Sequence, residues 1–226
     1  MKEKKTFYCE FAYILGIIVL ALGNTFMVRA DFGMSMVVAP AYIIHLKVSQ
    51  ILPFFTFGMS GYVFQFFLLI ALFIVMRKFE KRYLLSFVTA VIYGFVLDAV
   101  MSVVALFPYN GTVWRVVFFV LGMLVSSTGV ALLLRASFPP EAYDLFVKEV
   151  SRKFNISITK VKTIYDFSSC ILGVALSLAF FDGFQGVSWG TAICALLNGW
   201  LIGTIGKLFE SKFVFKEGRL LRKIGN

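Results

Sequence analysis

Long apolar stretches separated by short polar segments run through the whole chain. There are six of them, at residues 11–28, 54–76, 83–107, 113–134, 164–181 and 187–209. Each is long enough, at about 1.5 Å of rise per helical residue, to cross a hydrocarbon core about 30 Å thick. The pattern predicts an all-α polytopic membrane protein with six transmembrane helices.

Two further segments each follow one of these stretches and do not fit a full span. Residues 33–46 are apolar on all sides and begin with a glycine, which predicts a half-helix that dips into the protein, where its backbone is shielded from lipid. Residues 139–154 open with Pro-Pro-Glu, a sequence suited to a first helical turn. Apolar residues on one side of this segment and lysines and arginines on the other predict an amphipathic helix lying along the inner membrane interface.

The stretch from Leu15 to Phe32 returns 106 residues later as Leu121 to Phe138. Seven of the eighteen positions are identical, including a pair of glycines and a closing Arg-Ala-x-Phe. The repetition predicts a duplicated unit, with one copy in residues 1–110 and the other in residues 111–226. Because each copy would hold three spans, an odd number, the second copy would enter the membrane from the opposite side, as an inverted repeat.

Composition and charge fit this interpretation. The chain is 60% hydrophobic, well above the roughly 45–50% of soluble domains. Its formal charge of +10 could indicate nucleic-acid binding, but the basic residues flank the spans. If residues 33–53 do not cross and the N-terminus is cytoplasmic, nineteen of the 22 lysines and arginines fall on the inside. We therefore expect both termini in the cytoplasm, a retained first span, contact with the lipid bilayer and no nucleic-acid partner.

The sequence offers no recognisable catalytic or metal-binding motif. The three cysteines show no CxxC spacing, and His45 has no second ligand near it. No nucleophile with a base, paired carboxylates, phosphate loop or HExxH occurs. We expect a protein that is not an enzyme and that binds neither a cofactor nor a metal.

Polar residues inside the spans are the main candidates for binding. Asp98 lies near the middle of the third span and Asp166 in the inner third of the fifth. An ionised carboxylate at this depth costs several kcal/mol unless it faces a partner or a water-filled cavity, so both are candidates for a substrate or ion site. The alternative is that Asp98 pairs with a buried cation or caps the broken backbone of residues 33–40. Asn24, Gln65 and Asn198 are either cavity liners or interhelical hydrogen-bond partners.

Arginines and glycines form a second group of candidates. Arg29 and Arg135 end equivalent spans, where cations interact with the helix dipole and headgroups, or where they could act as paired gates or anion contacts. Gly94, Gly199 and Gly203 lie in the third and sixth spans at spacings typical of close helix packing. The functional alternative is that these two helices cross at the centre and line a cavity.

Several short motifs resemble one family of bacterial proteins. They are Ala21-Leu22-Gly23, Asp31-Phe32-Gly33-Met34-Ser35 leading to Pro40, Gly94-x3-Asp98, Trp189-Gly190-Thr191 and Asn198-Gly199. With these motifs the chain is similar to the YczE/YyaS/YitT family of bacterial integral membrane proteins, although members have a glycine pair where Gly186-Val187 stands here. The resemblance implies a location in the bacterial inner membrane and no settled biochemistry.

These features together predict a small secondary transporter. It would move a small solute across the inner membrane by alternating access, coupled to protons or cations through Asp98. The alternatives are a substrate-binding membrane subunit of a multi-component importer, a non-transporting scaffold or regulator, and a lipid translocator. A homodimer is compatible with the sequence.

Overall fold

The computed structural model describes residues 5–107, 111–136 and 138–218. The tip of the turn at 108–110, Ser137 within the repeated stretch and the basic residues before Lys5 and after Gly218 lie outside the described residues. Six helices of the described chain are long and apolar enough to span a membrane. They are α1 (Cys9–Ala30), α3 (Phe57–Met76), α4 (Lys81–Ala105), α5 (Thr112–Leu133), α7 (Ile158–Phe181) and α8 (Trp189–Lys212).

The two shorter helices take the places expected for the non-spanning segments. Helix α2 (Ala39–Val48) follows α1, and α6 (Ala142–Phe154) follows α5. With ten residues, α2 is about 15 Å long and covers only half of a bilayer. It packs against α3 and α7, while α6 packs against α3, α4 and α7. The half-helix starts later than predicted, because Gly33 has a φ of 97° and belongs to the preceding loop.

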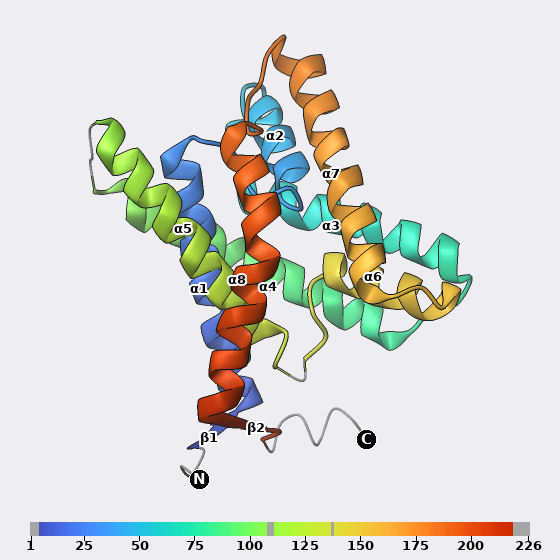
Figure 1. The fold of residues 1–226 in the computed structure, drawn as a ribbon. Coiled ribbons are helices and arrows are strands. Elements are labelled where there is room, and N and C mark those ends of the chain that lie inside the picture. The colour runs from blue at the N-terminus through green and yellow to red at the C-terminus, as the bar shows by residue number, and fades with distance from the viewer. Residues whose placement is uncertain (1–4, 108–110, 137, 219–226) are drawn as a thin grey trace.

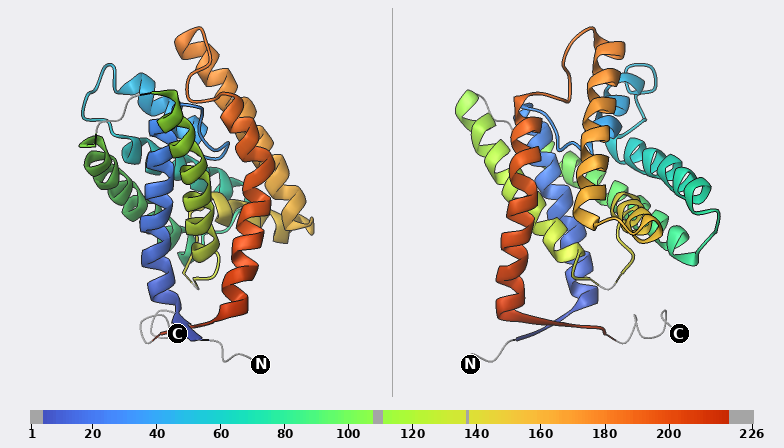
Figure 2. Two further views of the ribbon diagram at one scale, coloured as in Figure 1. Left: turned by 60° about the vertical axis from the view of Figure 1, so that its left-hand side comes forward. Right: turned by 45° about the vertical axis from the view of Figure 1, so that its right-hand side comes forward.

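Helices α1 and α5 form the central pair of the molecule. They run side by side, with α4 packed against α1 and α8 packed against α5 (Figures 1 and 2). The glycines of the repeated stretch make this close approach possible. A Cβ at Gly23 would lie 2.3 Å from the Ser126 nitrogen, and a Cβ at Gly129 would lie 2.5 Å from the Leu20 nitrogen. Any side chain at either glycine would therefore push the two helices apart.

Two short strands join the ends of the described chain. Strand β1 (Lys5–Tyr8) precedes α1 and pairs in parallel with β2 (Phe213–Lys216), which follows α8. The Gly218 nitrogen also donates a hydrogen bond to Glu10 Oε2 at 3.0 Å. From the sequence, these segments are recognisable only by their basic residues, because four-residue strands are too short to give a periodic signal. The pairing places both ends on the same side of the helical bundle (Figure 1).

The spans differ from the predicted ranges mainly at their charged ends. Helix α7 begins at Ile158, six residues before the predicted apolar stretch, and α4 begins at Lys81. Apolar length sets the membrane-crossing part, but a helix continues beyond it wherever long lysine side chains can reach water. Lys162 therefore lies on α7 rather than in the loop before it.

Candidate functional site

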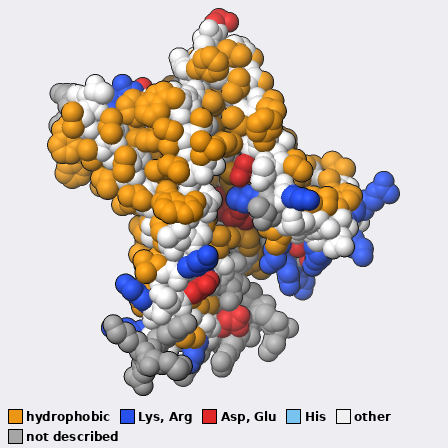
Figure 3. Space-filling view, viewed as in Figure 1, with side chains coloured by type: hydrophobic (Ala, Val, Ile, Leu, Met, Phe, Trp, Pro, Cys, Tyr) orange, Lys and Arg blue, Asp and Glu red, His pale blue; other side chains and the backbone are white. Residues whose placement is uncertain are grey.

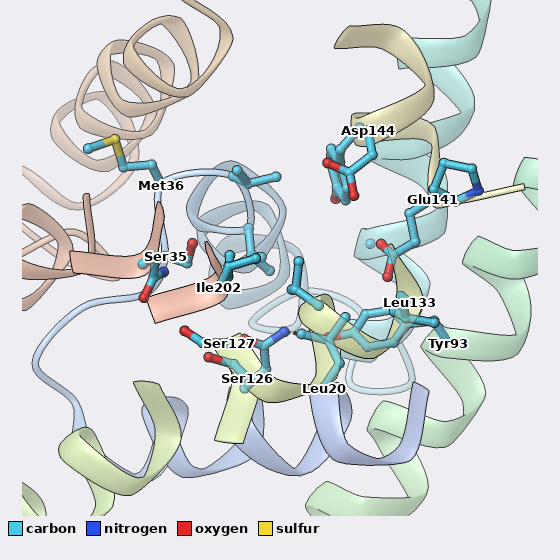
Figure 4. Close-up of a pocket in the computed structure, with 18 of the residues that line it drawn as sticks. Leu20, Ser35, Met36, Tyr93, Ser126, Ser127, Leu133, Glu141, Asp144 and Ile202 are labelled. Atoms are coloured by element: carbon cyan, nitrogen blue, oxygen red, sulfur yellow. Dashed lines mark hydrogen bonds between the residues drawn. The ribbon is translucent and has the colours of Figure 1, made fainter. Parts of the chain in front are cut away.

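A cavity of about 400 Å³ lies between two groups of helices. Helices α1, α5 and α8 form one wall, while α3, α4, α6 and α7 form the other. Figure 3 shows the hollow between α8 and the α6–α7 corner, with acidic side chains deep inside it and a basic side chain at its edge. Figure 4 shows the walls of the cavity.

Glu141 is the most buried charged group of the cavity. It directly precedes α6, and only 8% of the residue is exposed. Its Oε2 atom accepts a hydrogen bond from Gln65 Nε2 at 3.0 Å, while Gln65 Oε1 accepts one from the Ala142 nitrogen at 2.9 Å. The other carboxylate oxygen, Oε1, is buried and has no hydrogen-bond partner among the described residues. Gln65 thus fixes the carboxylate to the start of α6 and leaves one oxygen of it in the cavity (Figure 4).

The environment of Glu141 changes its protonation. Burial raises the pKa of its carboxyl group to about 8, and the nearby charge of Asp144 adds to this rise. The hydrogen bond from Gln65 acts in the opposite direction, with a smaller effect. The carboxyl group of Glu141 therefore keeps its proton to a higher pH than the carboxyl group of an exposed glutamate does.

The opposite wall, from α1 and α5, is polar but uncharged. Asn24 Nδ2 donates a hydrogen bond to the Tyr93 hydroxyl of α4 at 2.5 Å, and both residues line the cavity. Ser126 and Ser127 of α5 face the cavity, and Ser127 Oγ is buried without a partner among the described residues (Figure 4). This wall can offer hydroxyl and amide groups to a ligand but no charge.

The edge of the cavity carries two more carboxylates and one cation. Lys162 Nζ lies 3.8 Å from Asp144 Oδ1 and 3.7 Å from Asp166 Oδ1. Asn198 of α8 lines the cavity as well, and its Oδ1 atom is buried without a hydrogen-bond partner in the described chain. Together with Glu141, the described part of the site holds three carboxyl groups and one ammonium group.

The structure brings most of the predicted binding residues together. Asn24, Gln65, Asp166 and Asn198 come from four different spans and all line this cavity. Asn24 and Gln65 also make the interhelical hydrogen bonds given as their alternative role. The two roles coincide because these amides hold other lining groups in place.

Asp98 is held elsewhere, at the start of α3. Its Oδ2 atom accepts a hydrogen bond from Thr56 Oγ1 at 2.6 Å, and its Oδ1 atom accepts one from the Gly58 nitrogen at 2.8 Å. A carboxylate in this position satisfies a free backbone N–H group and interacts favourably with the helix dipole. Asp98 is not among the residues that line the cavity. The contact resembles the capping role considered from the sequence, although Asp98 caps the start of α3 rather than the backbone of residues 33–40.

The two repeated arginines bind the ends of neighbouring helices. Arg29 Nη2 donates hydrogen bonds to the carbonyl oxygens of Val104, at 3.1 Å, and Phe107, at 2.5 Å, at the end of α4. Arg135 Nη2 lies 2.6 Å from Glu210 Oε1, near the end of α8. Neither arginine lines the cavity. In this structure both act as anchors between helices.

The three glycines named from the sequence differ in their packing. A Cβ at Gly94 would lie 2.9 Å from the Gly58 carbonyl oxygen, so this glycine allows α3 and α4 to pack closely. At Gly199 and Gly203 no described atom lies within 4 Å of that position. Gly199 lines the cavity instead. The close-packing interpretation therefore holds for Gly94 but not for Gly199 and Gly203.

Glu141 is the residue that sequence reasoning missed. From the sequence, its charge is explained by the positive end of a helix, which is a sufficient reason when no cavity is known. The internal repeat makes Glu141 equivalent to Ser35, because it lies 106 residues later, in the loop that follows the repeated stretch. This equivalence is the one feature of the sequence that relates Glu141 to a residue on the other side of the cavity. Both residues line the cavity, on opposite sides of it (Figure 4).

These features define a polytopic helical membrane protein with six candidate spans and a polar cavity between them. The chain belongs to a family of unknown function, DUF6198, which matches residues 7–207 and so includes every residue discussed for the cavity. Comparisons with curated proteins and with solved structures give no match. The resemblance to the YczE/YyaS/YitT family is not tested by these comparisons and stays a prediction.

Proposed function

We propose that the protein is a small secondary transporter built from two inverted three-span repeats, with its substrate site in the cavity between them. The observation that carries this proposal is that contacts between the halves occur in pairs. Gly23 contacts Ser126, and Gly129 contacts Leu20. Gly129 is the residue equivalent to Gly23, 106 positions later, and Leu20 is the residue equivalent to Ser126, 106 positions earlier. A two-fold axis relates contacts in this way.

Two further glycines of the central pair follow the same rule. A Cβ at Gly16 would lie 2.9 Å from Leu133 Cγ, and a Cβ at Gly122 would lie 2.8 Å from Met27 Cγ. Gly122 is equivalent to Gly16, and Met27 is equivalent to Leu133, so these two contacts are also equivalent in the two halves. Residues that follow Gly16 in α1 contact residues that precede Leu133 in α5, so the two helices are antiparallel. An axis that relates antiparallel spanning helices lies in the membrane plane, as in transporters with inverted repeats.

Basic residues at the helix ends extend the relation beyond the central pair. Lys47, on α2, donates a hydrogen bond to the Phe180 carbonyl at the end of α7, at 3.0 Å. Lys153, 106 residues later on α6, donates one to the Val75 carbonyl at the end of α3. Arg29 and Arg135 bind the ends of α4 and α8 in the same paired manner. The pairs therefore involve all four helices of each half.

One pair of helices breaks this relation. Helix α3 packs closely on α4, whereas the corresponding helices α7 and α8 hardly touch, and the cavity lies between them. In inverted-repeat transporters, the two halves exchange such conformations when access alternates between the two membrane faces. If the termini are cytoplasmic, as the charge distribution predicts, the open side faces the cytoplasm. Closing α7 on α8 while α3 separates from α4 would then open the cavity to the outside.

Glu141 replaces Asp98 in this proposal as the group that couples transport to protons. Asp98 is bound by Thr56 and by the backbone of Gly58 at the start of α3, whereas Glu141 has an oxygen in the cavity with no partner in the described chain. Protonation of Glu141 lowers the negative charge that must reorient with the cavity, and ionised Glu141 adds a buried negative charge that attracts a cation. Binding of a proton or of substrate would thus be alternative ways to neutralise the same carboxylate.

The proposal is tested by measuring the distance between α7 and α8. Spin labels at the exposed positions Lys160→Cys and Lys207→Cys, in a variant whose native cysteines are serines, report this distance in reconstituted protein. Alternating access predicts two distance populations whose ratio changes with pH, because protonation of Glu141 favours one conformation. In Glu141→Gln the ratio should no longer depend on pH.

A matched pair of labels on the central helices provides the control. Ile18→Cys on α1 and Leu124→Cys on α5 occupy exposed positions of helices that pack through glycines, so they should give one distance under all conditions. A single α7–α8 distance at every pH would contradict the transporter proposal and favour a scaffold or a binding subunit.

A further inference from the structure

The charge of the cavity restricts what it can bind. Glu141, Asp144 and Asp166 contribute three carboxyl groups, while Lys162 is the one basic side chain among the described residues that line the cavity. Lys162 lies within 4 Å of both aspartates and can neutralise only one of them. The site therefore keeps an excess of negative charge, which increases when Glu141 is ionised, and anions are disfavoured.

Two unpaired groups on opposite walls provide independent evidence for a ligand. The buried oxygen Oε1 of Glu141 has no partner in the described chain, and neither has Ser127 Oγ, although only 2% of Ser127 is exposed. A buried polar group that has lost its water without gaining a hydrogen bond destabilises the folded state. Both residues line the same cavity, so one occupant between the walls can satisfy both.

Aromatic and aliphatic side chains form much of the remaining lining, beside the polar residues already described. Rings from four helices and one loop border the cavity: Tyr13, Phe57, Tyr93, Phe138 and Tyr143. Aromatic faces attract cations, most strongly where water is excluded. The volume of about 400 Å³ lies within the usual range for sites of drug-sized molecules. This combination suits a bulky organic ion better than a bare proton or metal ion.

The cavity also borders the lipid phase. Helices α7 and α8 do not pack together along the cavity, and Gly199 leaves open space beside it. Ile158 of α7, which is 56% exposed, and Ile202 of α8 both line the cavity, so apolar side chains from both helices lie beside it. A gap between α7 and α8 would give a molecule dissolved in the bilayer a route to the carboxylates.

We infer that the cavity binds a monovalent organic cation with a bulky apolar body, which enters from the membrane between α7 and α8. This inference rests on the proposed transporter function, since it names the substrate class of the same site. The positive centre would lie between Glu141 and Ser127, and the apolar groups would contact the rings and the opening.

Two ions of nearly equal size and opposite charge test the inference. Tetraphenylphosphonium and tetraphenylborate are titrated into the purified full-length protein at pH 8.5, and binding is measured by equilibrium dialysis. The phosphonium should bind at least about tenfold more tightly than the borate. Glu141→Gln should weaken phosphonium binding by about tenfold or more, because a cation then lacks its buried partner.

Further variants keep the test decisive if Glu141→Gln does not fold. Asp166→Asn changes a half-buried carboxylate on the cavity edge and should weaken phosphonium binding by a few-fold. Glu80→Gln is the matched control, because Glu80 is paired with Arg152 outside the cavity and its removal should leave binding unchanged. Equal binding of both ions, no phosphonium binding, or binding that survives both cavity substitutions would each overturn the inference.

The distance measurement separates this inference from the function on which it rests. Two α7–α8 distances with equal binding of both ions would retain the transporter and remove the cationic substrate class. One fixed distance with selective phosphonium binding would retain a cation site and remove transport.

Discussion

Affinity for an organic cation should depend steeply on pH, because one buried carboxyl group controls the charge of the cavity. Burial and the charge of Asp144 raise the pKa of Glu141 to about 8. The other titratable groups around it come from four helices: Tyr13 of α1, Tyr93 of α4, Tyr143 and Asp144 of α6, and Lys162, Tyr165 and Asp166 of α7. The perturbation is a change of pH from 6 to 9, in the native protein and in Glu141→Gln.

The size of the effect follows from the ionised fraction of Glu141. With a pKa of about 8, roughly 1% of the carboxyl groups are ionised at pH 6 and about half at pH 8. If only the ionised form binds the cation, the apparent affinity should rise roughly fifty-fold between these two values and level off near pH 9.

The free energy of unfolding should fall over the pH range in which the affinity rises. The folded state holds this proton more tightly than the unfolded chain does, so stability falls as the pH rises from about 4.5 towards 8.

Equilibrium dialysis of tetraphenylphosphonium at several pH values measures the profile. Glu141→Gln should give a weak and nearly flat profile, whereas Asp166→Asn should keep the slope and lower the plateau, since it leaves Glu141 in place. A flat profile in the native protein would refute the reasoning. So would a steep profile that persists in Glu141→Gln, because another group would then control binding.

Three further predictions concern packing and capping. Gly23→Ala should lower the free energy of unfolding by about 1–3 kcal/mol, because its methyl carbon would lie 2.3 Å from the α5 backbone. Gly199→Ala should change this free energy by less than about 0.5 kcal/mol, because no described atom lies within 4 Å of the added methyl carbon. Equal losses for both variants in thermal unfolding would contradict the packing. Asp98→Asn should cost about 1–2 kcal/mol at the start of α3 and leave phosphonium affinity unchanged. If Asp98→Asn lost phosphonium affinity while its free energy of unfolding stayed unchanged, Asp98 would have to be part of the binding site. Lys47→Met and Lys153→Met should speed hydrogen exchange in the last turns of α7 and α3 respectively, and unchanged exchange in both would argue against the paired contacts.

The spanning helices could be predicted from sequence because a bilayer imposes a minimum apolar length that can be counted along the chain. The same rule explains why α2 is recognisable as non-spanning, since Pro40, His45 and Lys47 interrupt its apolar run. Strands β1 and β2 could not be predicted, because each is stabilised by a partner more than 200 residues away. Helix boundaries at charged ends were missed for a related reason, since apolar length does not limit how far a helix extends into water.

The candidate site was only partly predictable, and Asp98 and Glu141 show why. Depth in a span made Asp98 the strongest candidate, but its hydrogen bonds to Thr56 and Gly58 depend on how α3 packs against α4. Glu141 lies outside the spans, so the rule that singles out intramembrane carboxylates did not apply to it. Its burial results from the packing of α6 against α3 and α7. Sequence reasoning could therefore locate polar residues along the chain but could not tell which of them were already paired.

The repeat itself suggests why a single carboxyl group would carry the coupling. The position equivalent to Glu141 in the first half is Ser35, and the position equivalent to Gln65 in the second half is Ile171. The carboxylate–amide pair thus occurs once, although the backbone positions that could hold it occur twice. In the proposed inverted repeat, a symmetric frame would provide two equivalent conformations, and one ionisable group that is not duplicated would make a single proton or cation decisive for both. Transport by this protein should therefore exchange one proton for each monovalent cation, which the ratio of proton flux to phosphonium flux in proteoliposomes would measure.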